Sequence, residues 1–80
     1  MKEKIRKIIK DHARLPIDVA MLEDSSDLGE AGMTSHANVM LMLALENEFD
    51  LEFPDTMLSR RVFESVDSIA AAIEVLQPGR

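Results

Sequence analysis

Residues 35–49 read SHANVMLMLALENEF, and this stretch decides how the chain folds. At 100° per residue along an α-helix, its apolar side chains fall into two stripes. One stripe, with Asn38 at its edge, consists of Leu41, Met42, Leu45 and Phe49. The other lies on roughly the opposite side and consists of His36, Val39, Met40 and Leu43. The pattern predicts a helix with one stripe in a core and the other partly exposed, as at an interaction surface.

Three more helices are predicted around this one. Residues 2–14 place Ile5, Ile8, Ile9, His12 and Ala13 at helical spacing, and Pro16 ends the pattern. After Pro54, either Asp55 or Thr56 is expected to cap a short helix that reaches about Val62. Ser65 is expected to cap the last helix, whose apolar contacts would come from Val66, Ile69, Ala70, Ile73, Val75 and Leu76.

Between the first two helices, residues 15–34 keep no apolar period and predict a long loop. A few of its side chains are expected to tuck onto the core: Ile17, Val19, Met21, Leu22 and Leu28. A loop this long in a small domain is often functional. The chain is thus predicted to be all-α, a small four-helix bundle forming a single domain over residues 1–80, with a core over about 3–76 and a tail at 77–80.

Composition limits the function. The chain has 80 residues and no cysteine. A domain of this size buries only about 60% of the surface of its unfolded chain, so a deep, water-excluding active site is not expected. Without cysteine there is neither a disulfide nor a thiolate nucleophile or metal ligand. No apolar segment follows the basic N-terminus, and the longest uncharged run, 31–45, includes polar residues. We therefore expect no signal peptide or membrane span, and a cytoplasmic location.

The charge is distributed unevenly. Net charge is -6, yet six of the nine basic residues lie in the first 14 positions. Residues 15–59 contain ten carboxylates and neither Lys nor Arg. Such a field repels nucleic acids and anionic membranes and attracts basic protein surfaces. The predicted partners are therefore proteins, not nucleic acid or membrane, and the chain itself is expected to be a monomer.

Ser35 is the residue whose chemistry must be decided. With His36 beside it, Ser35 resembles a catalytic nucleophile, but successive helical residues point about 100° apart, so His36 is badly placed as its base. No catalytic residue is therefore predicted. The segment DSSDLG (24–29) begins like a calcium loop, but Leu28 stands at its fifth position and Ser35 at its twelfth, where a glutamate is needed. Two isolated histidines make no zinc site, so no metal is expected either.

Two interpretations of Ser35 remain open on the residues alone. It could be the N-cap of the helix, a role that Thr34 could fill equally well. Alternatively, it could carry an attached group, because the N-terminal dipole of a helix favours a phosphate there.

Across nearly its whole length the chain resembles the acyl carrier protein family. The resemblance rests on the order of a helix, a long acidic loop, DLG (27–29), a serine opening an apolar helix, and LENEFDLEFPD (45–55). It implies the acyl-carrier type of four-helix bundle and a non-catalytic role. It also implies 4'-phosphopantetheine on Ser35, whose terminal thiol holds a cargo as a thioester, and a phosphopantetheinyl transferase as a partner. A borrowed thiol fits a chain without cysteine.

The segment around the serine departs from fatty-acid carriers. Thr34, Ser35 and His36 replace the usual DSL, residues 29–35 are lengthened, and Met40 stands where a glutamate normally faces basic partners. The resemblance therefore implies docking through the apolar stripe rather than through ion pairs. The expected partner-facing residues are Thr34, His36, Val39, Met40 and Leu43.

A narrower resemblance is to the aminoacyl carrier proteins. It rests on GMTSHA (32–37) with EFPD (52–55), ML (57–58) and RRVFESVDSI (60–69). It implies loading with glycine or alanine by an ATP-dependent amino acid:carrier protein ligase similar to a class II aminoacyl-tRNA synthetase, and transfer to an unknown downstream enzyme. The alternatives are an acyl carrier of a specialised fatty-acid, polyketide or peptide pathway, and a small helical interaction adaptor in which Ser35 is only a cap.

Overall fold

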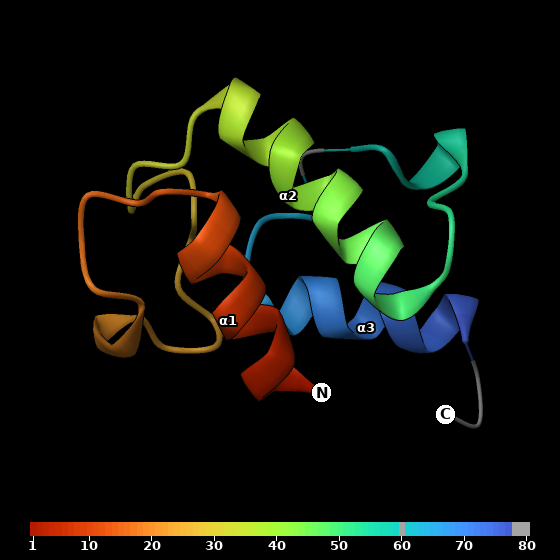
Figure 1. Cartoon of the computed structure of the whole chain (residues 1–80), viewed down its shortest axis with the longest axis horizontal. Coiled ribbons are helices and arrows are strands. Elements are labelled where there is room, and N and C mark those ends of the chain that lie inside the picture. The colour runs from red at the N-terminus through yellow and green to blue at the C-terminus, as the bar shows by residue number, and fades with distance from the viewer. Residues whose placement is uncertain (60, 78–80) are drawn as a thin grey trace.

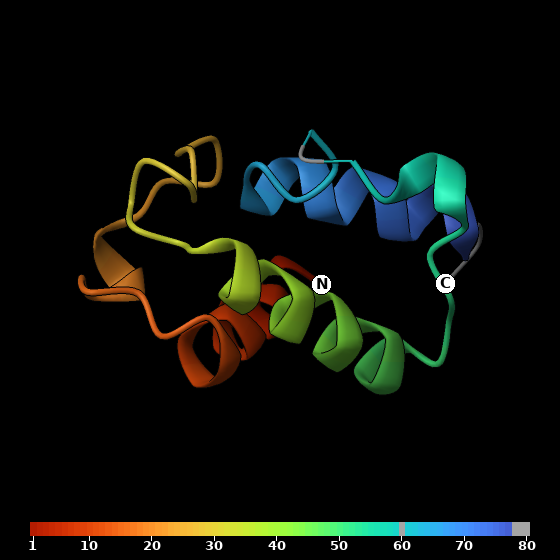
Figure 2. The same cartoon turned by 90° about the horizontal axis from the view of Figure 1, so that it is seen from above.

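The computed structural model describes residues 1–59 and 61–77, which form three α-helices and two short 3-10 helices. The helices are α1 (Lys2–His12), α2 (Ser35–Phe49) and α3 (Val66–Leu76), and the 3-10 helices are η1 (Val19–Met21) and η2 (Asp55–Met57). Helix α1 packs against both α2 and α3 (Figures 1 and 2). The predicted all-α fold and the bounds of the helix over 35–49 are confirmed. Within the described residues, no helix is long and apolar enough to cross a membrane.

The core lies where the three helices meet. Its largest fully buried side chains come from all three helices and from one loop position: Ile5, Ile9, Leu28, Leu41, Leu45, Val66, Ile69 and Ile73. Burying each such side chain stabilises the fold by about 1.5–3 kcal/mol. The first stripe of α2 therefore enters the core as predicted, with Met42 and Phe49 packed at its edge.

Several expectations are wrong. The short helix predicted to reach Val62 ends at Met57, because Leu58 leaves the helical region with φ -88° and ψ 48°. Val75 is 70% exposed, since it lies 200° around the helix from buried Ile73. Ile17 and Met21 are also exposed, while Val19, Leu22 and Leu28 are buried as expected. Residues 78–80 of the predicted tail lie outside the described residues.

The long loop is fastened by Arg6 of α1. The Arg6 guanidinium donates to the carbonyl oxygens of Val19 at 3.0 Å and Leu22 at 2.8 Å, and to the Asp24 carboxylate at 2.7 Å. Two backbone hydrogen bonds then tie the loop to the start of α3. The Asp67 N–H donates to the Asp24 carbonyl at 3.0 Å, and the Leu28 N–H donates to the Glu64 carbonyl at 2.8 Å. The loop therefore reaches α2 along a fixed path.

The charges of this network affect two pKa values. The hydrogen bond from Arg6 lowers the pKa of the Asp24 carboxyl below its ordinary 3.8. The hydrogen bond to Asp67, 2.7 Å from the ammonium nitrogen, raises the pKa of Lys2 above 10.5. A carboxyl whose pKa is lower in the folded state stabilises the fold above its unfolded pKa and loses that effect as pH falls through the folded pKa. The contribution of Asp24 is thus complete above its ordinary pKa and lost in strong acid.

We expect Arg6→Ala to lower the free energy of unfolding at pH 7 by about 1–3 kcal/mol, because the hydrogen bonds to the two loop carbonyls are lost. The variant should also lose less stability than the wild type between pH 5 and about pH 2, because the largest cause of the lowered pKa of Asp24 is removed and only the weaker effect of Lys2 remains. Urea denaturation followed by circular dichroism at several pH values measures both effects. Lys7→Ala, an exposed change on the same helix, is the control. Equal midpoints for both variants would contradict this account of the loop.

Candidate functional site

The N-terminus of α2 is capped by Thr34. Thr34 has an extended backbone, with φ -83° and ψ 167°, and its Oγ1 accepts a hydrogen bond from the Ala37 N–H at 3.0 Å. Ser35 is the first helical residue and is exposed. Within the part of the chain that the structure describes, the Ser35 hydroxyl has no hydrogen-bond partner. The sequence allowed either Thr34 or Ser35 as the N-cap of α2, and the structure shows that Thr34 is the cap. The Ser35 hydroxyl is therefore free for other chemistry.

A tight turn delivers the chain to this cap. The Asp27 carboxylate accepts from the Glu30 N–H at 3.1 Å, and the Met33 N–H donates to the Leu28 carbonyl at 3.0 Å. Gly32 has φ +111°, and a Cβ atom there would lie 2.6 Å from Cδ of Pro16. Only glycine meets both conditions without strain. The loop therefore turns within a few residues and presents Ser35 at the surface.

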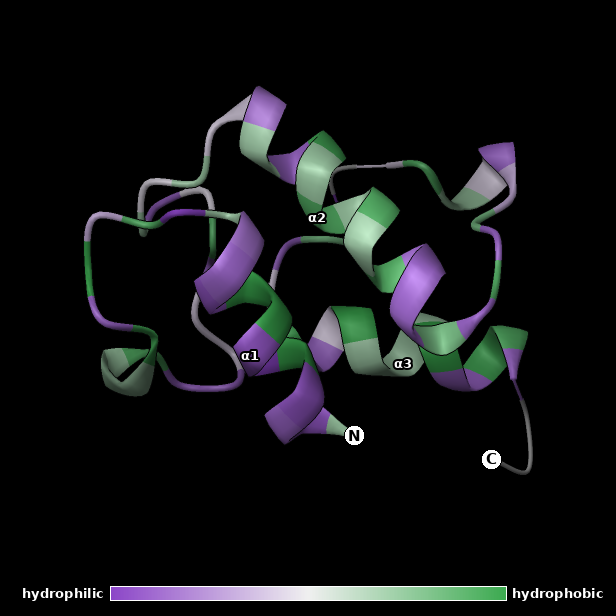
Figure 3. Cartoon of the chain, in the orientation of Figure 1, coloured by the Kyte–Doolittle hydropathy of each residue, from purple (hydrophilic) through white to green (hydrophobic). Residues whose placement is uncertain are grey.

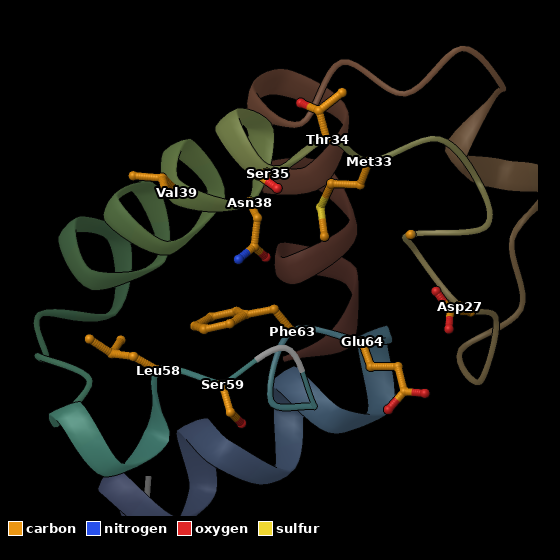
Figure 4. A pocket seen from close by; sticks show the side chains of 11 residues that line it. Asp27, Met33, Thr34, Ser35, Asn38, Val39, Leu58, Ser59, Phe63 and Glu64 are labelled. Carbon is orange, nitrogen blue, oxygen red and sulfur yellow. The ribbon is translucent and has the colours of Figure 1, made fainter.

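Ser35 and His36 belong to different hollows. Ser35 lines a cleft of about 520 Å³ together with Asn38 and Val39 of α2 and, across the cleft, Leu58, Ser59 and Phe63 (Figure 4). His36 lines a separate hollow of about 320 Å³ between the end of α1 and α2, with His12, Arg14 and Met40. The two residues therefore face different surroundings and do not make the nucleophile and base of a hydrolase.

Among residues 1–59 and 61–77, no three His, Cys, Asp or Glu side chains gather where they could hold a metal ion. Asp27 and Glu64 both line the cleft beside Ser35, but they are only two carboxylates.

The second stripe of α2 lies at the surface. Val39, Met40 and Leu43 are 49%, 41% and 50% exposed, and His36 is exposed beside them. Figure 3 shows hydrophobic colour over the middle turns of α2 and hydrophilic colour toward its ends. Both carboxylates of α2 lie in its last turns: Glu46 accepts from the Phe53 N–H at 2.8 Å, and Glu48 lies 3.9 Å from the Lys4 ammonium. The exposed stripe near Ser35 is therefore apolar and carries no acid.

Sequence reasoning missed three residues of this region. Leu58, 46% exposed, lies across the cleft from Val39, and the buried Phe63 packs edge-to-face on Phe53 with ring centroids 5.1 Å apart. Asn38 was placed only at the edge of the core stripe, yet its side chain enters the cleft (Figure 4). Leu58 lies within, and Phe63 just after, the stretch expected to form a short helix, and no local pattern predicted that either would lie near Ser35.

Comparisons with known proteins identify the class. Residues 3–73 match the family described as phosphopantetheine attachment site. The chain is 39% identical, over all 80 residues and 96% of the relative, to an aminoacyl carrier protein of Agrobacterium fabrum. It is 31% identical over 75 residues, 94% of this chain and 87% of the relative, to an acyl carrier protein of Phenylobacterium zucineum.

A solved structure agrees. The chain matches one from the crystal structure of an engineered Bradyrhizobium japonicum glycine:carrier protein ligase complexed with a carrier protein from Agrobacterium tumefaciens and AMP. The TM-score is 0.90 at 40% identity, over 92% of this chain and 99% of the matched chain.

The fold and the match over residues 3–73 define a non-catalytic carrier, whose reactive group comes from a cofactor. The chain belongs to the phosphopantetheine-attachment family of carrier proteins.

The assignment of the cap can be tested directly. We expect Thr34→Ala to lower the free energy of unfolding by about 1 kcal/mol, because the Ala37 N–H loses its side-chain acceptor. Ser35→Ala should change it by less than about 0.5 kcal/mol, as an exposed substitution usually does. Urea denaturation of the unmodified proteins compares the two. If Ser35→Ala is the more damaging change, Ser35 is the cap and its hydroxyl is not free.

Proposed function

We propose that this chain is an aminoacyl carrier protein that bears 4'-phosphopantetheine on Ser35 and accepts glycine as a thioester. The observation that carries the proposal is the free, exposed hydroxyl of Ser35 at the first position of α2, with Thr34 doing the capping. The similarity to a carrier solved with a glycine:carrier protein ligase supports glycine as the cargo. Alanine is the other small amino acid that the same phosphopantetheine thiol could carry.

The residues around Ser35 fit the cofactor. A phosphodiester on the Ser35 oxygen would stand at a helix N-terminus, where free N–H groups and the helix dipole favour negative charge. The first turn of α2 contains no acidic residue to repel it. The cofactor, when bound, supplies the thiol that the chain lacks. An ATP-dependent ligase of the class II synthetase type would transfer the aminoacyl group from the activated amino acid to that thiol, with release of the activating group and of the thiol proton.

The partner face that we propose consists of Thr34, His36, Val39, Met40 and Leu43. These residues surround or follow Ser35 on one exposed side of α2, so an enzyme that reaches the cofactor must come close to them. The phosphopantetheinyl transferase, the ligase and a downstream acceptor enzyme would each use this face in turn. We further propose that the chain works as a single domain over residues 1–80, as a monomer and in the cytoplasm.

A second candidate is an acyl carrier of a specialised fatty-acid, polyketide or peptide pathway. The 31% identity to an acyl carrier protein favours it. The two candidates share the cofactor and differ in the cargo. An assay of which group is loaded onto the cofactor thiol therefore distinguishes them, whereas attachment of the cofactor to Ser35 does not.

Modification of Ser35 is the first test. Coexpression with a phosphopantetheinyl transferase should increase the intact mass of the native protein by one phosphopantetheinyl group, and Ser35→Ala should abolish the increase. The holo protein, incubated with ATP, a glycine:carrier protein ligase and glycine, should then gain one glycyl group. Ser35→Asn keeps a polar side chain at this exposed position but removes the hydroxyl, and it should be inactive. Full function of Ser35→Asn in cells would instead indicate an interaction adaptor that needs no cofactor.

The partner face is tested by Met40→Glu. We expect the KM of the ligase for the holo carrier to rise roughly 10-fold, because a carboxylate must be desolvated in an apolar contact. Met21→Glu is the matched control, since Met21 is 79% exposed on η1, away from Ser35. Circular dichroism should show the same helix content in both variants. Equal loading kinetics for the two would remove Met40 from the face.

A further inference from the structure

The cleft beside Ser35 contains a half-buried amide whose hydrogen-bonding groups are unused. Asn38 lies one turn after Ser35, and its side chain extends from α2 across the cleft toward Phe63 (Figure 4). The Asn38 backbone N–H donates to the Thr34 carbonyl at 2.9 Å. Its side-chain oxygen and nitrogen have no partner among the residues that the structure describes. A primary amide offers two donors and an acceptor oxygen, so this group is available to a ligand.

The walls of the cleft combine apolar and polar surfaces. Val39, Leu58 and Phe63 are apolar, and Phe63 is fixed by its edge-to-face contact with Phe53. Ser59 and Asn38 add neutral polar groups, and the carboxylates of Asp27 and Glu64 also line the cleft. The cleft volume of about 520 Å³ lies within the range of small-molecule sites. The cleft therefore suits a slender ligand that carries amide groups as well as an apolar part.

We propose that Asn38 is a positioning residue that binds an amide group of the phosphopantetheine arm, so that the arm rests in this cleft when the carrier is not docked. The inference rests on the proposed function, because it requires the arm to be attached to Ser35. The arm contains two secondary amides and a dimethyl carbon. Each amide presents one donor and one acceptor, which match the acceptor and donors of Asn38, and the apolar walls suit the dimethyl carbon.

A hydrogen bond between Asn38 and the arm would be weak enough to be broken each time the carrier docks. Hydrogen bonds that are exchanged against water bias an equilibrium only modestly, here by roughly 3- to 10-fold. A docking enzyme can therefore withdraw the arm without a large cost. The amide of Asn38 also opposes a long alkyl chain in the cleft, since burying it against hydrocarbon would leave its polar groups without partners. The cleft thus favours the arm itself and a small polar cargo.

Nuclear magnetic resonance on isotope-labelled apo and holo protein tests the proposal. On phosphopantetheinylation, the Asn38 side-chain amide and the Phe63 ring should change their chemical shifts and show contacts to arm protons. Asn47 is the matched control, an exposed asparagine on the same helix whose side-chain signals should not move. In holo Asn38→Leu, which keeps the approximate shape, the ratio of resting to free arm should fall 3- to 10-fold. The arm amide signals would then approach those of free pantetheine.

Asn38→Ala provides a second variant if the leucine repacks the cleft, and it should give the same shift toward free pantetheine, whereas Asn47→Leu should leave the arm signals unchanged. A protein that is modified on Ser35 but shows no change at Asn38 overturns this inference and leaves the proposed function standing. The same holds for arm signals unaffected by both Asn38 variants. A protein that a transferase does not modify at all overturns both.

Discussion

The rest of the structure depends on the hydrogen bonds that the Arg6 guanidinium donates to the long loop. A single side chain of α1 binds the Val19 and Leu22 carbonyls and the Asp24 carboxylate, and Asp24 in turn receives the Asp67 N–H at the start of α3. A loop that buries only Val19, Leu22 and Leu28 cannot be ordered by burial alone, because fixing each backbone residue costs about 1–2 kcal/mol. Fastening the loop in its first half gives its second half, with the Gly32 turn, a fixed point from which to deliver Ser35.

At the end of that path, two neighbouring hydroxyl residues divide two tasks. Thr34 satisfies the Ala37 N–H, so helix stability does not depend on the Ser35 side chain. If the same serine both capped the helix and carried a cofactor, attachment of the cofactor would convert the capping hydroxyl into a phosphodiester oxygen and disturb the cap. With the cap on Thr34, the proposed attachment of a cofactor to Ser35 would leave the capping hydrogen bond of α2 and the exposed stripe unchanged.

Local sequence patterns predicted much of the fold and part of the candidate site. The apolar period predicted the helix at 35–49, the capping pattern predicted Ser65 as the N-cap of α3, and the resemblance to acyl carrier proteins implied a carrier. The sequence did not distinguish Thr34 from Ser35 as the cap, because both are hydroxyl residues and the outcome depends on the backbone that the loop imposes on Thr34. Leu58 and Asn38 were missed for a related reason. Their position at the cleft follows from the packing of α2 against a segment far away in the chain, which places Leu58 across the cleft from Val39, and no local period records this packing.

The two stripes of α2 would allow so small a domain to serve the several enzymes proposed above. Leu41 and Leu45 hold the helix in the core, so its outer face keeps one shape whichever protein approaches. Because Val39, Met40 and Leu43 are uncharged, that face gives little long-range attraction, and recognition there must depend on close fit. An acidic surface elsewhere on the chain can still steer a basic partner before contact. Steering and close fit would then depend on different residues, so an uncharged substitution in the exposed stripe would alter the fit to the proposed partners without changing the net charge of the carrier.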